Sequence, residues 1–129
     1  MQDFFYVKDG CTHIQVLFSE LQYIEAEDKY VMLLTTKGKH MLLQSLQIVE
    51  KALPSEFFCR IHRSYIISLA HTKWFDHNTA FVGGRKLPIG KHYKGILPRR
   101  VLIFNNEPKP YIKLSDFDVL SLSRKTKPN

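Results

Sequence analysis

The chain has 129 residues, enough for one domain with a single hydrophobic core, and it is 44% hydrophobic and 24% charged, as soluble globular proteins are. No apolar run approaches the roughly 20 residues that cross a bilayer, and nothing resembles a signal peptide. Two cysteines, Cys11 and Cys59, are too few for a disulfide framework and lack metal-ligand spacing. These features argue against membrane and disulfide-rich secreted proteins and favour a reducing cytoplasm.

The net charge of +7 is concentrated in one third of the chain. Residues 60–100 hold nine Lys and Arg against one acid, whereas the remaining residues hold ten against eleven acids. A surface polarised in this way suits a polyanion better than a small substrate. Because Tyr, Ile, Leu and Phe alternate with the bases, we expect a folded surface and not a basic tail. The charge pattern therefore favours nucleic-acid binding.

Alternating apolar and β-branched residues predict a series of short strands in the first part of the chain. The pair Asp9-Gly10 has the composition of a hairpin turn, and 27–29 and 37–39 are predicted turns. The expected strands are 3–8, 12–18, 22–26, 30–36 and 40–43. One stretch has helical spacing instead: 46–53 is predicted as a short helix, with Ser45 as its N-cap.

The second part of the chain continues the strand series. The pair Gly83-Gly84 predicts a second hairpin turn, and 90–97 is predicted to form one or two basic helical turns. The tail after Pro98 is predicted to be partly ordered, with one strand at 101–104 and a strand or amphipathic segment within 111–122. The expected strands are 57–61, 65–69, 73–75, 79–82 and 85–89, and His62-Arg63-Ser64 separates the first two. Many short strands with one helix indicate a mostly β fold.

Four strings in one order resemble the LytTR family, the DNA-binding output domain of LytR/AlgR-type bacterial response regulators. They are DFFYVK at 3–8, LQYIEAEDKYV at 21–31, FFCRIHRSYII at 57–67 and KLPIGKHY at 86–93. The resemblance covers about residues 3–97. It implies an elongated sandwich of short antiparallel sheets with one or two short helices, and a division into a domain at 1–97 and a C-terminal extension at 98–129.

The resemblance also implies that loops, and not a recognition helix, enter successive major grooves of DNA. These loops correspond here to 27–30, the His-Arg-Ser motif and 90–94. The chain departs from the usual pattern at Ser68, where family members often carry Asn, and at Gly90-Lys91, where they often carry Ser-Arg. Lys is a point charge, whereas Arg can donate two hydrogen bonds to guanine, so phosphate binding is the firmer expectation at Lys91.

Arg63 is the first candidate for reading a base edge, because its planar fork sits in a polar break between strands. The alternative is a surface arginine paired with a carboxylate. Ser64 is expected either to donate to a phosphate or to cap the turn. His62 is expected to be structural, bonded to a backbone carbonyl. The other candidate DNA-binding residues are Lys29, Tyr30, Lys91, His92 and Lys94, of which Tyr30 is expected to be half in the core.

Other basic residues have plainer interpretations. Arg85 and Lys86 follow the Gly-Gly turn and are expected to belong to a solvent-exposed hairpin. Arg99 and Arg100 either extend the basic face or are solvated linker charges.

Catalysis finds little support, because the six histidines form no metal-ligating pattern and no glycine-rich phosphate loop is present. We therefore expect no enzyme and no cofactor. The predicted function is sequence-specific binding of double-stranded DNA in a bacterial transcription regulator. The resemblance implies direct repeats, a possible homodimer on DNA and a receiver domain N-terminal to this one, so that the chain is an excised fragment or a stand-alone form. The alternative is a small β-rich module that binds RNA or a protein.

Overall fold

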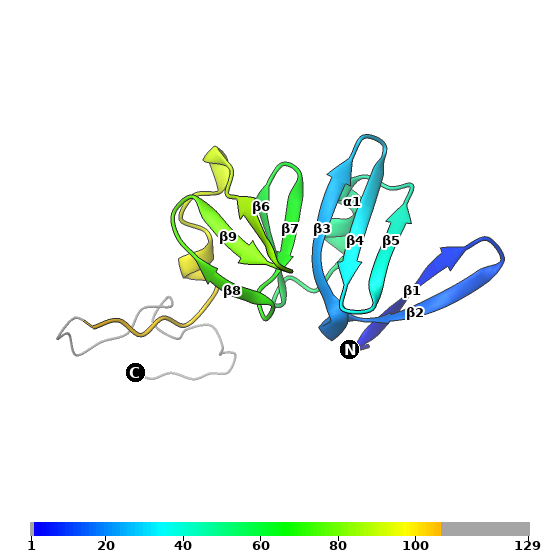
Figure 1. Ribbon diagram of the computed structural model, residues 1–129, viewed down its shortest axis with the longest axis horizontal. Coiled ribbons are helices and arrows are strands. Elements are labelled where there is room, and N and C mark those ends of the chain that lie inside the picture. Colours follow the sequence, from blue (N-terminus) through cyan, green and yellow to red (C-terminus); the bar gives the residue numbers. More distant parts are fainter. Residues whose placement is uncertain (1, 107–129) are drawn as a thin grey trace. The chain divides into compact units, whose positions relative to one another are not determined.

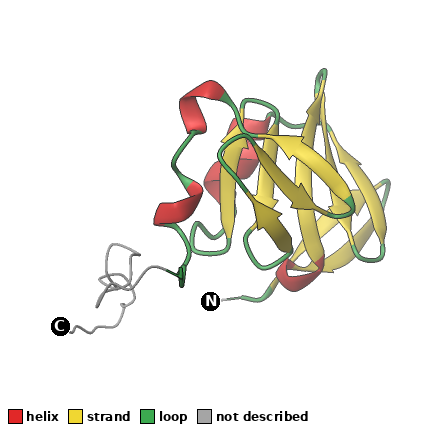
Figure 2. Ribbon diagram, turned by 60° about the vertical axis from the view of Figure 1, so that its left-hand side comes forward, coloured by secondary structure: helices red, strands yellow, loops and turns green. Residues whose placement is uncertain are grey.

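The computed structural model describes residues 2–106 and divides the chain into two compact units, 1–93 and 94–129. Strands dominate the described residues (Figure 2). The first unit contains β1 (Phe4–Asp9), β2 (Thr12–Leu17), η1 (Phe18–Glu20), β3 (Leu21–Glu27), β4 (Tyr30–Thr35), β5 (Gly38–Leu42), α1 (Leu46–Ala52), β6 (Phe58–His62), β7 (Tyr65–Ser68), β8 (Thr72–Phe75), β9 (Thr79–Val82), β10 (Arg85–Pro88) and η2 (Lys91–Tyr93). The described part of the second unit contains η3 (Leu97–Arg99).

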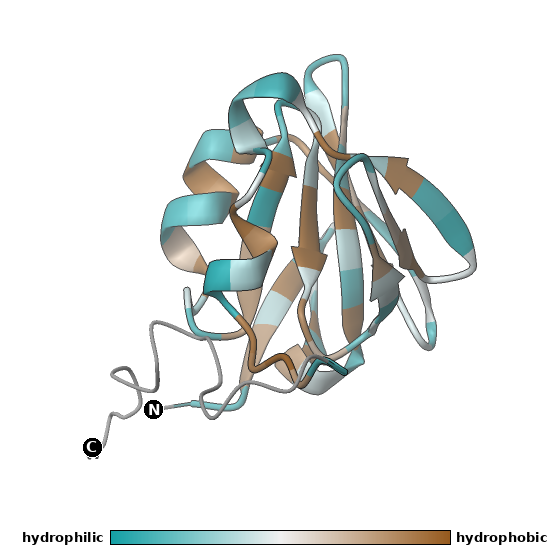
Figure 3. Ribbon diagram, turned by 90° about the vertical axis from the view of Figure 1, so that its left-hand side faces the viewer, coloured by the Kyte–Doolittle hydropathy of each residue, from teal (hydrophilic) through white to brown (hydrophobic). Residues whose placement is uncertain are grey.

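A five-stranded antiparallel sheet forms the middle of the first unit, with the strand order β5-β4-β3-β7-β6 (Figure 1). Its central strand, β3, pairs with β4 from Leu21 to Glu27 and with β7 from Tyr23 to Glu25. Apolar residues recur along the strands (Figure 3). In β7 all four residues are buried, and Val31, Met32 and Leu33 of β4 are buried in succession, so both faces of this sheet are covered by other layers.

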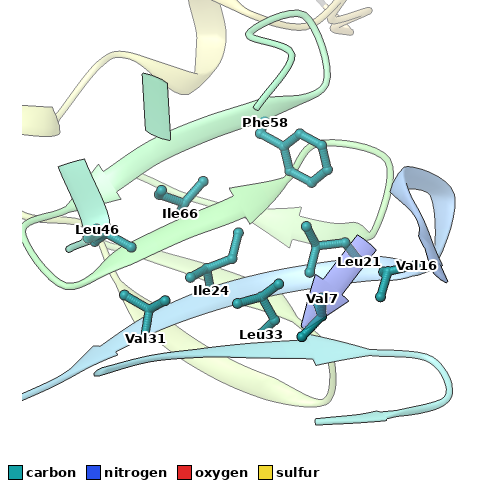
Figure 4. Close-up of a cluster of buried hydrophobic side chains, with 9 residues drawn as sticks. All are labelled: Val7, Val16, Leu21, Ile24, Val31, Leu33, Leu46, Phe58 and Ile66. Carbon is teal, nitrogen blue, oxygen red and sulfur yellow. The ribbon is translucent and has the colours of Figure 1, made fainter. Parts of the chain in front are cut away.

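The β1–β2 hairpin and α1 cover one face of the five-stranded sheet. Nine buried side chains from the hairpin, the sheet and the helix form one cluster there (Figure 4). Ser45 caps α1 by accepting a hydrogen bond from the Ile48 N–H at 3.2 Å. The members of the cluster are Val7, Val16, Leu21, Ile24, Val31, Leu33, Leu46, Phe58 and Ile66.

The three-stranded sheet β8-β9-β10 packs against the opposite face. Gly83 and Gly84, with φ of 59° and 79°, make the predicted hairpin turn between β9 and β10, a conformation that glycine adopts without steric cost. A Cβ on Gly83 would lie 2.9 Å from Leu34 and 3.0 Å from Tyr23 of the central sheet. Only a residue without a side chain allows the two sheets to approach this closely.

The prediction of a mostly β, antiparallel fold with few short helices is confirmed, and nearly all expected strands are present. The expected strand at 101–104 is wrong, because Ile103 makes only an isolated bridge. The expectation for 111–122 lies outside the described residues. The domain boundary expected between residues 97 and 98 stays a prediction, and the two compact units divide between residues 93 and 94.

Candidate nucleic-acid interface

The β3–β4 turn presents the first predicted loop. Glu27 pairs with Tyr30 across it, and Asp28 adopts a left-handed φ of 60°, which Asp tolerates better than most residues. The side chain of Lys29 is exposed. Tyr30 is 43% exposed, so more than half of its surface is covered, in agreement with the expectation that it lies half in the core.

The β6–β7 turn carries Arg63 and Ser64, between the paired residues His62 and Tyr65. The Ala26 N–H at the end of β3 donates to the Ser64 carbonyl oxygen at 2.9 Å, which places this turn beside the β3–β4 turn. Among the described residues, the exposed guanidinium of Arg63 has no hydrogen-bond or ion-pair partner. The alternative interpretation, a surface arginine paired with a carboxylate, is therefore not supported.

His62 shapes the backbone of this turn. Its Nδ1 accepts a hydrogen bond from the Ser64 N–H at 3.0 Å, and its ring lies 5.5 Å from the ring of Tyr65. The expected structural role is thus present, but its partner is a backbone N–H and not a carbonyl. Burial, and then the nearby charges of Arg63 and Arg60, lower the pKa of His62 below its usual value. A neutral ring is the form that can accept this bond.

The segment after β10 lies against the same turn. The Gly90 N–H donates to the Ile61 carbonyl oxygen at 2.7 Å, and a Cβ on Gly90 would meet His62 at 3.3 Å. The residues that follow, Lys91 and His92, are exposed at the start of η2. In Figure 1 both turns and η2 lie at the upper edge of the ribbon.

We call this edge of the first unit, formed by Lys29, Tyr30, Arg63, Ser64, Lys91 and His92, the basic edge. It unites six of the seven predicted site residues from three separate parts of the sequence. The seventh, Lys94, is the first residue of the second unit and is not counted in the basic edge.

The family model of the LytTr DNA-binding domain matches residues 12–100. The chain belongs to this family. A solved LytTr DNA-binding domain, from a Bacillus cereus protein described as a methyl-accepting/DNA response regulator, superposes with a TM-score of 0.61. It is 29% identical, and the match covers 72% of this chain and 91% of that domain.

Two longer proteins are also similar to this LytTR domain. Sensory transduction protein LytT of Bacillus subtilis is 29% identical over 80 residues, which are 57% of this chain and 33% of that protein. Transcriptional regulatory protein LytR of Staphylococcus aureus is 35% identical over 65 residues, which are 46% of this chain and 26% of that protein. The matched part thus spans about a third or less of these curated relatives. The family is one of DNA-binding domains and not a class of enzyme.

Arg85 of the LytTR domain has a role that its position in the sequence did not reveal. Its guanidinium donates to the Glu25 carboxylate at 3.0 Å and to the Tyr23 hydroxyl at 3.1 Å, and it lies 3.4 Å from the Tyr65 hydroxyl. The hydrogen bonds to Tyr23 and Glu25 raise the pKa of Arg85. Arg85 is exposed on the β9–β10 hairpin, as expected, but its side chain also joins this hairpin to the central sheet.

The described part of the LytTR domain has neither a metal-binding cluster nor a membrane-spanning helix. Within residues 2–106 no group of three or more His, Cys, Asp and Glu side chains is arranged to hold a metal ion. No helix in this part of the chain is long and apolar enough to span a membrane. Cys11 is exposed and Cys59 is buried, and neither belongs to a disulfide in the part of the chain that the structure describes.

Proposed function

We propose that this LytTR domain binds double-stranded DNA in a sequence-specific manner through its basic edge. The two turns and η2 would enter successive major grooves, with the strands standing behind them as a rigid support. The observation that carries the proposal is the gathering of Lys29, Arg63 and Lys91 at one edge, although they are far apart in the sequence. Three cations on one edge can contact one duplex together.

The residues of the basic edge would divide into base readers and phosphate anchors. Arg63 would read a base edge, because an unpaired guanidinium can donate two hydrogen bonds to guanine O6 and N7. Lys29 and Lys91 would neutralise phosphates as point charges. The remaining predicted DNA contacts are Ser64 to a phosphate, Tyr30 and His92 at the basic edge, and Lys94 of the second unit.

We further propose that the full-length protein is a transcription regulator, because relatives of this domain carry the names sensory transduction protein and transcriptional regulatory protein. A receiver domain elsewhere in that protein would control DNA binding. Two protomers would bind direct repeats, so that two weak contacts made together give a tighter complex than either alone.

Selection of bound duplexes from a random pool would test the proposal and supply the operator sequence. The selected duplex should then compete for the domain better than a single-stranded RNA of equal charge. Preferential binding of the single strand would reject the proposal and favour the alternative.

One observation keeps that alternative, binding of RNA or of a protein, open to test. Trp74 is 43% exposed on the three-stranded sheet and stacks on Phe81 with an interplanar angle of 3°. Exposed aromatic rings on a sheet can stack with unpaired bases. A Trp74→Ala variant should bind duplex DNA as the wild type does, whereas the alternative requires a loss of single-strand binding.

A further inference from the structure

Arg60 lies in β6, three residues before Arg63, and its guanidinium is bonded through all three nitrogens. Nε donates to the His62 carbonyl oxygen at 3.0 Å, and one terminal nitrogen donates to the Arg63 carbonyl oxygen at 2.6 Å. The other terminal nitrogen pairs with the Glu50 carboxylate of α1 at 2.9 Å. Only 17% of the Arg60 side chain is exposed, so these bonds compete little with water.

These contacts stabilise the backbone that carries Arg63. The strand pairing between β6 and β7 is irregular between Arg60 and His62, so the regular ladder does not hold this part of the backbone. The two carbonyl oxygens that Arg60 binds flank the start of the turn. Glu50 fixes the guanidinium from the opposite side, and α1 is itself anchored in the core through Leu46.

We propose that Arg60 is a positioning residue, which holds the β6–β7 turn so that the Arg63 side chain projects from the basic edge in one direction. Arg60 itself would not bind DNA, although it lies in the most basic part of the sequence. The proposal rests on the proposed function. It deepens that function, because the base preference of Arg63 would depend on Arg60. A side chain reads a base only when the backbone that carries it is fixed.

The Arg60→Lys variant tests this role because it retains the charge but cannot bind three acceptors in a plane. Hydrogen exchange would be measured first, without DNA. Exchange of the Ser64 and Ala26 amides, which bond within and beside the turn, should become faster by roughly tenfold or more. The Lys37 amide, which bonds Thr35 Oγ1 at the other end of β4, is the matched control and should not change. Unchanged protection of Ser64 and Ala26 would overturn the proposal whether or not the domain binds DNA.

DNA binding supplies the second measurement. Arg60→Lys should weaken binding to the selected duplex by roughly tenfold, the size of one lost base contact, with an unchanged salt dependence and unchanged binding to random duplex. In an Arg63→Ala background the same change should have no further effect on specificity, because Arg60 acts through Arg63. An additive loss would contradict the proposal. Absence of binding by the wild-type domain would instead reject the proposed function.

A phosphate contact by Arg60 would have a different signature. The neutral Arg60→Gln variant would then lower the salt slope by about one and weaken all duplexes alike, as expected for one lost phosphate contact. Our proposal predicts that the salt slope of Arg60→Gln stays at the wild-type value while the preference for the selected duplex falls. A lowered slope would overturn it. The melting temperature of each variant separates both results from a general loss of stability.

Discussion

At the scale of single residues, three arginines with the same formal charge have different surroundings. Arg60 binds two carbonyl oxygens and Glu50, and Arg85 binds Glu25 and two tyrosines. Arg63 alone of the three extends from its turn without a partner among the described residues. A guanidinium that is free before binding need not break an existing bond to reach a base, so we assign base reading to Arg63.

The Arg63→Ala variant should lose about 1–3 kcal/mol of binding free energy for the selected duplex, and its preference among sequences should relax. Lys91→Ala should weaken all duplexes alike and lower the salt slope by about one. Fluorescence anisotropy with selected and random duplexes at several salt concentrations measures both effects. Identical behaviour of the two variants would refute the division into base reader and phosphate anchor.

His62 gives the fold a pH dependence with a definite sign. Burial and the charges of Arg63 and Arg60 lower the folded-state pKa below the usual value of 6.5, so the unfolded chain binds a proton first as the pH falls. The contribution of His62 to stability is therefore complete above that value and is lost as the pH falls through the folded-state pKa.

The His62→Asn variant keeps an acceptor for the Ser64 N–H but does not titrate. Its free energy of unfolding should fall less between about pH 7.5 and about pH 5 than that of the wild type. Urea unfolding across this range measures the difference. Parallel curves for the two proteins would show that His62 does not titrate in the predicted direction.

At the scale of elements, α1 connects the core to the basic edge. The helix has only seven residues, so the backbone groups at its ends, which need partners outside the helix, make up a large share of all its backbone groups. The Ser45→Ala variant removes the bond to the Ile48 N–H and should cost about 1 kcal/mol of unfolding free energy. Gln44→Ala, at the neighbouring exposed position outside the helix, is the control. Equal stability of both variants would contradict the role of Ser45 as a cap.

The contact between the sheets is a second element-scale feature. The Tyr65 hydroxyl donates to Glu25 at 3.1 Å and accepts from Arg85 at 3.4 Å, and burial, followed by the Glu25 charge, raises the Tyr65 pKa. Tyr65→Phe should lower the unfolding free energy by about 1 kcal/mol. Tyr6→Phe removes a hydroxyl from an exposed hairpin and should change it much less. A smaller loss for Tyr65→Phe than for Tyr6→Phe would count against this contact.

The strands, the hairpin turns and the capped helix were predictable because their signals are local. Alternation, a Gly-Gly pair and a serine before a helical pattern act within a few residues. The surroundings of Arg60 and Arg85 were not predictable. Their carboxylate partners, Glu50 and Glu25, lie 10 and 60 residues away in the sequence, and only the packed sheets bring them together. The six residues of the basic edge were named from the family resemblance, but their shared edge required the structure.

At the scale of the whole first unit, antiparallel topology places the cations. Neighbouring strands run in opposite directions. The β3–β4 and β6–β7 turns therefore lie at one end of the sheet, and the β4–β5 turn lies at the other. Lys37 and Lys39 flank the start of β5 at that far end and are exposed, as Lys29 is, and Lys37 also pairs with Glu20 at 2.9 Å. They serve as controls that carry the same charge away from the basic edge.

The most direct test compares the salt dependence of DNA binding for two doubly substituted variants. Lys29→Ala/Lys91→Ala removes two charges from the basic edge, and Lys37→Ala/Lys39→Ala removes two from the opposite end of the sheet. The first should lower the slope of log K against log salt by about two, and the second should leave it at the wild-type value. Equal slopes for the two variants would contradict the basic edge as the DNA-binding surface.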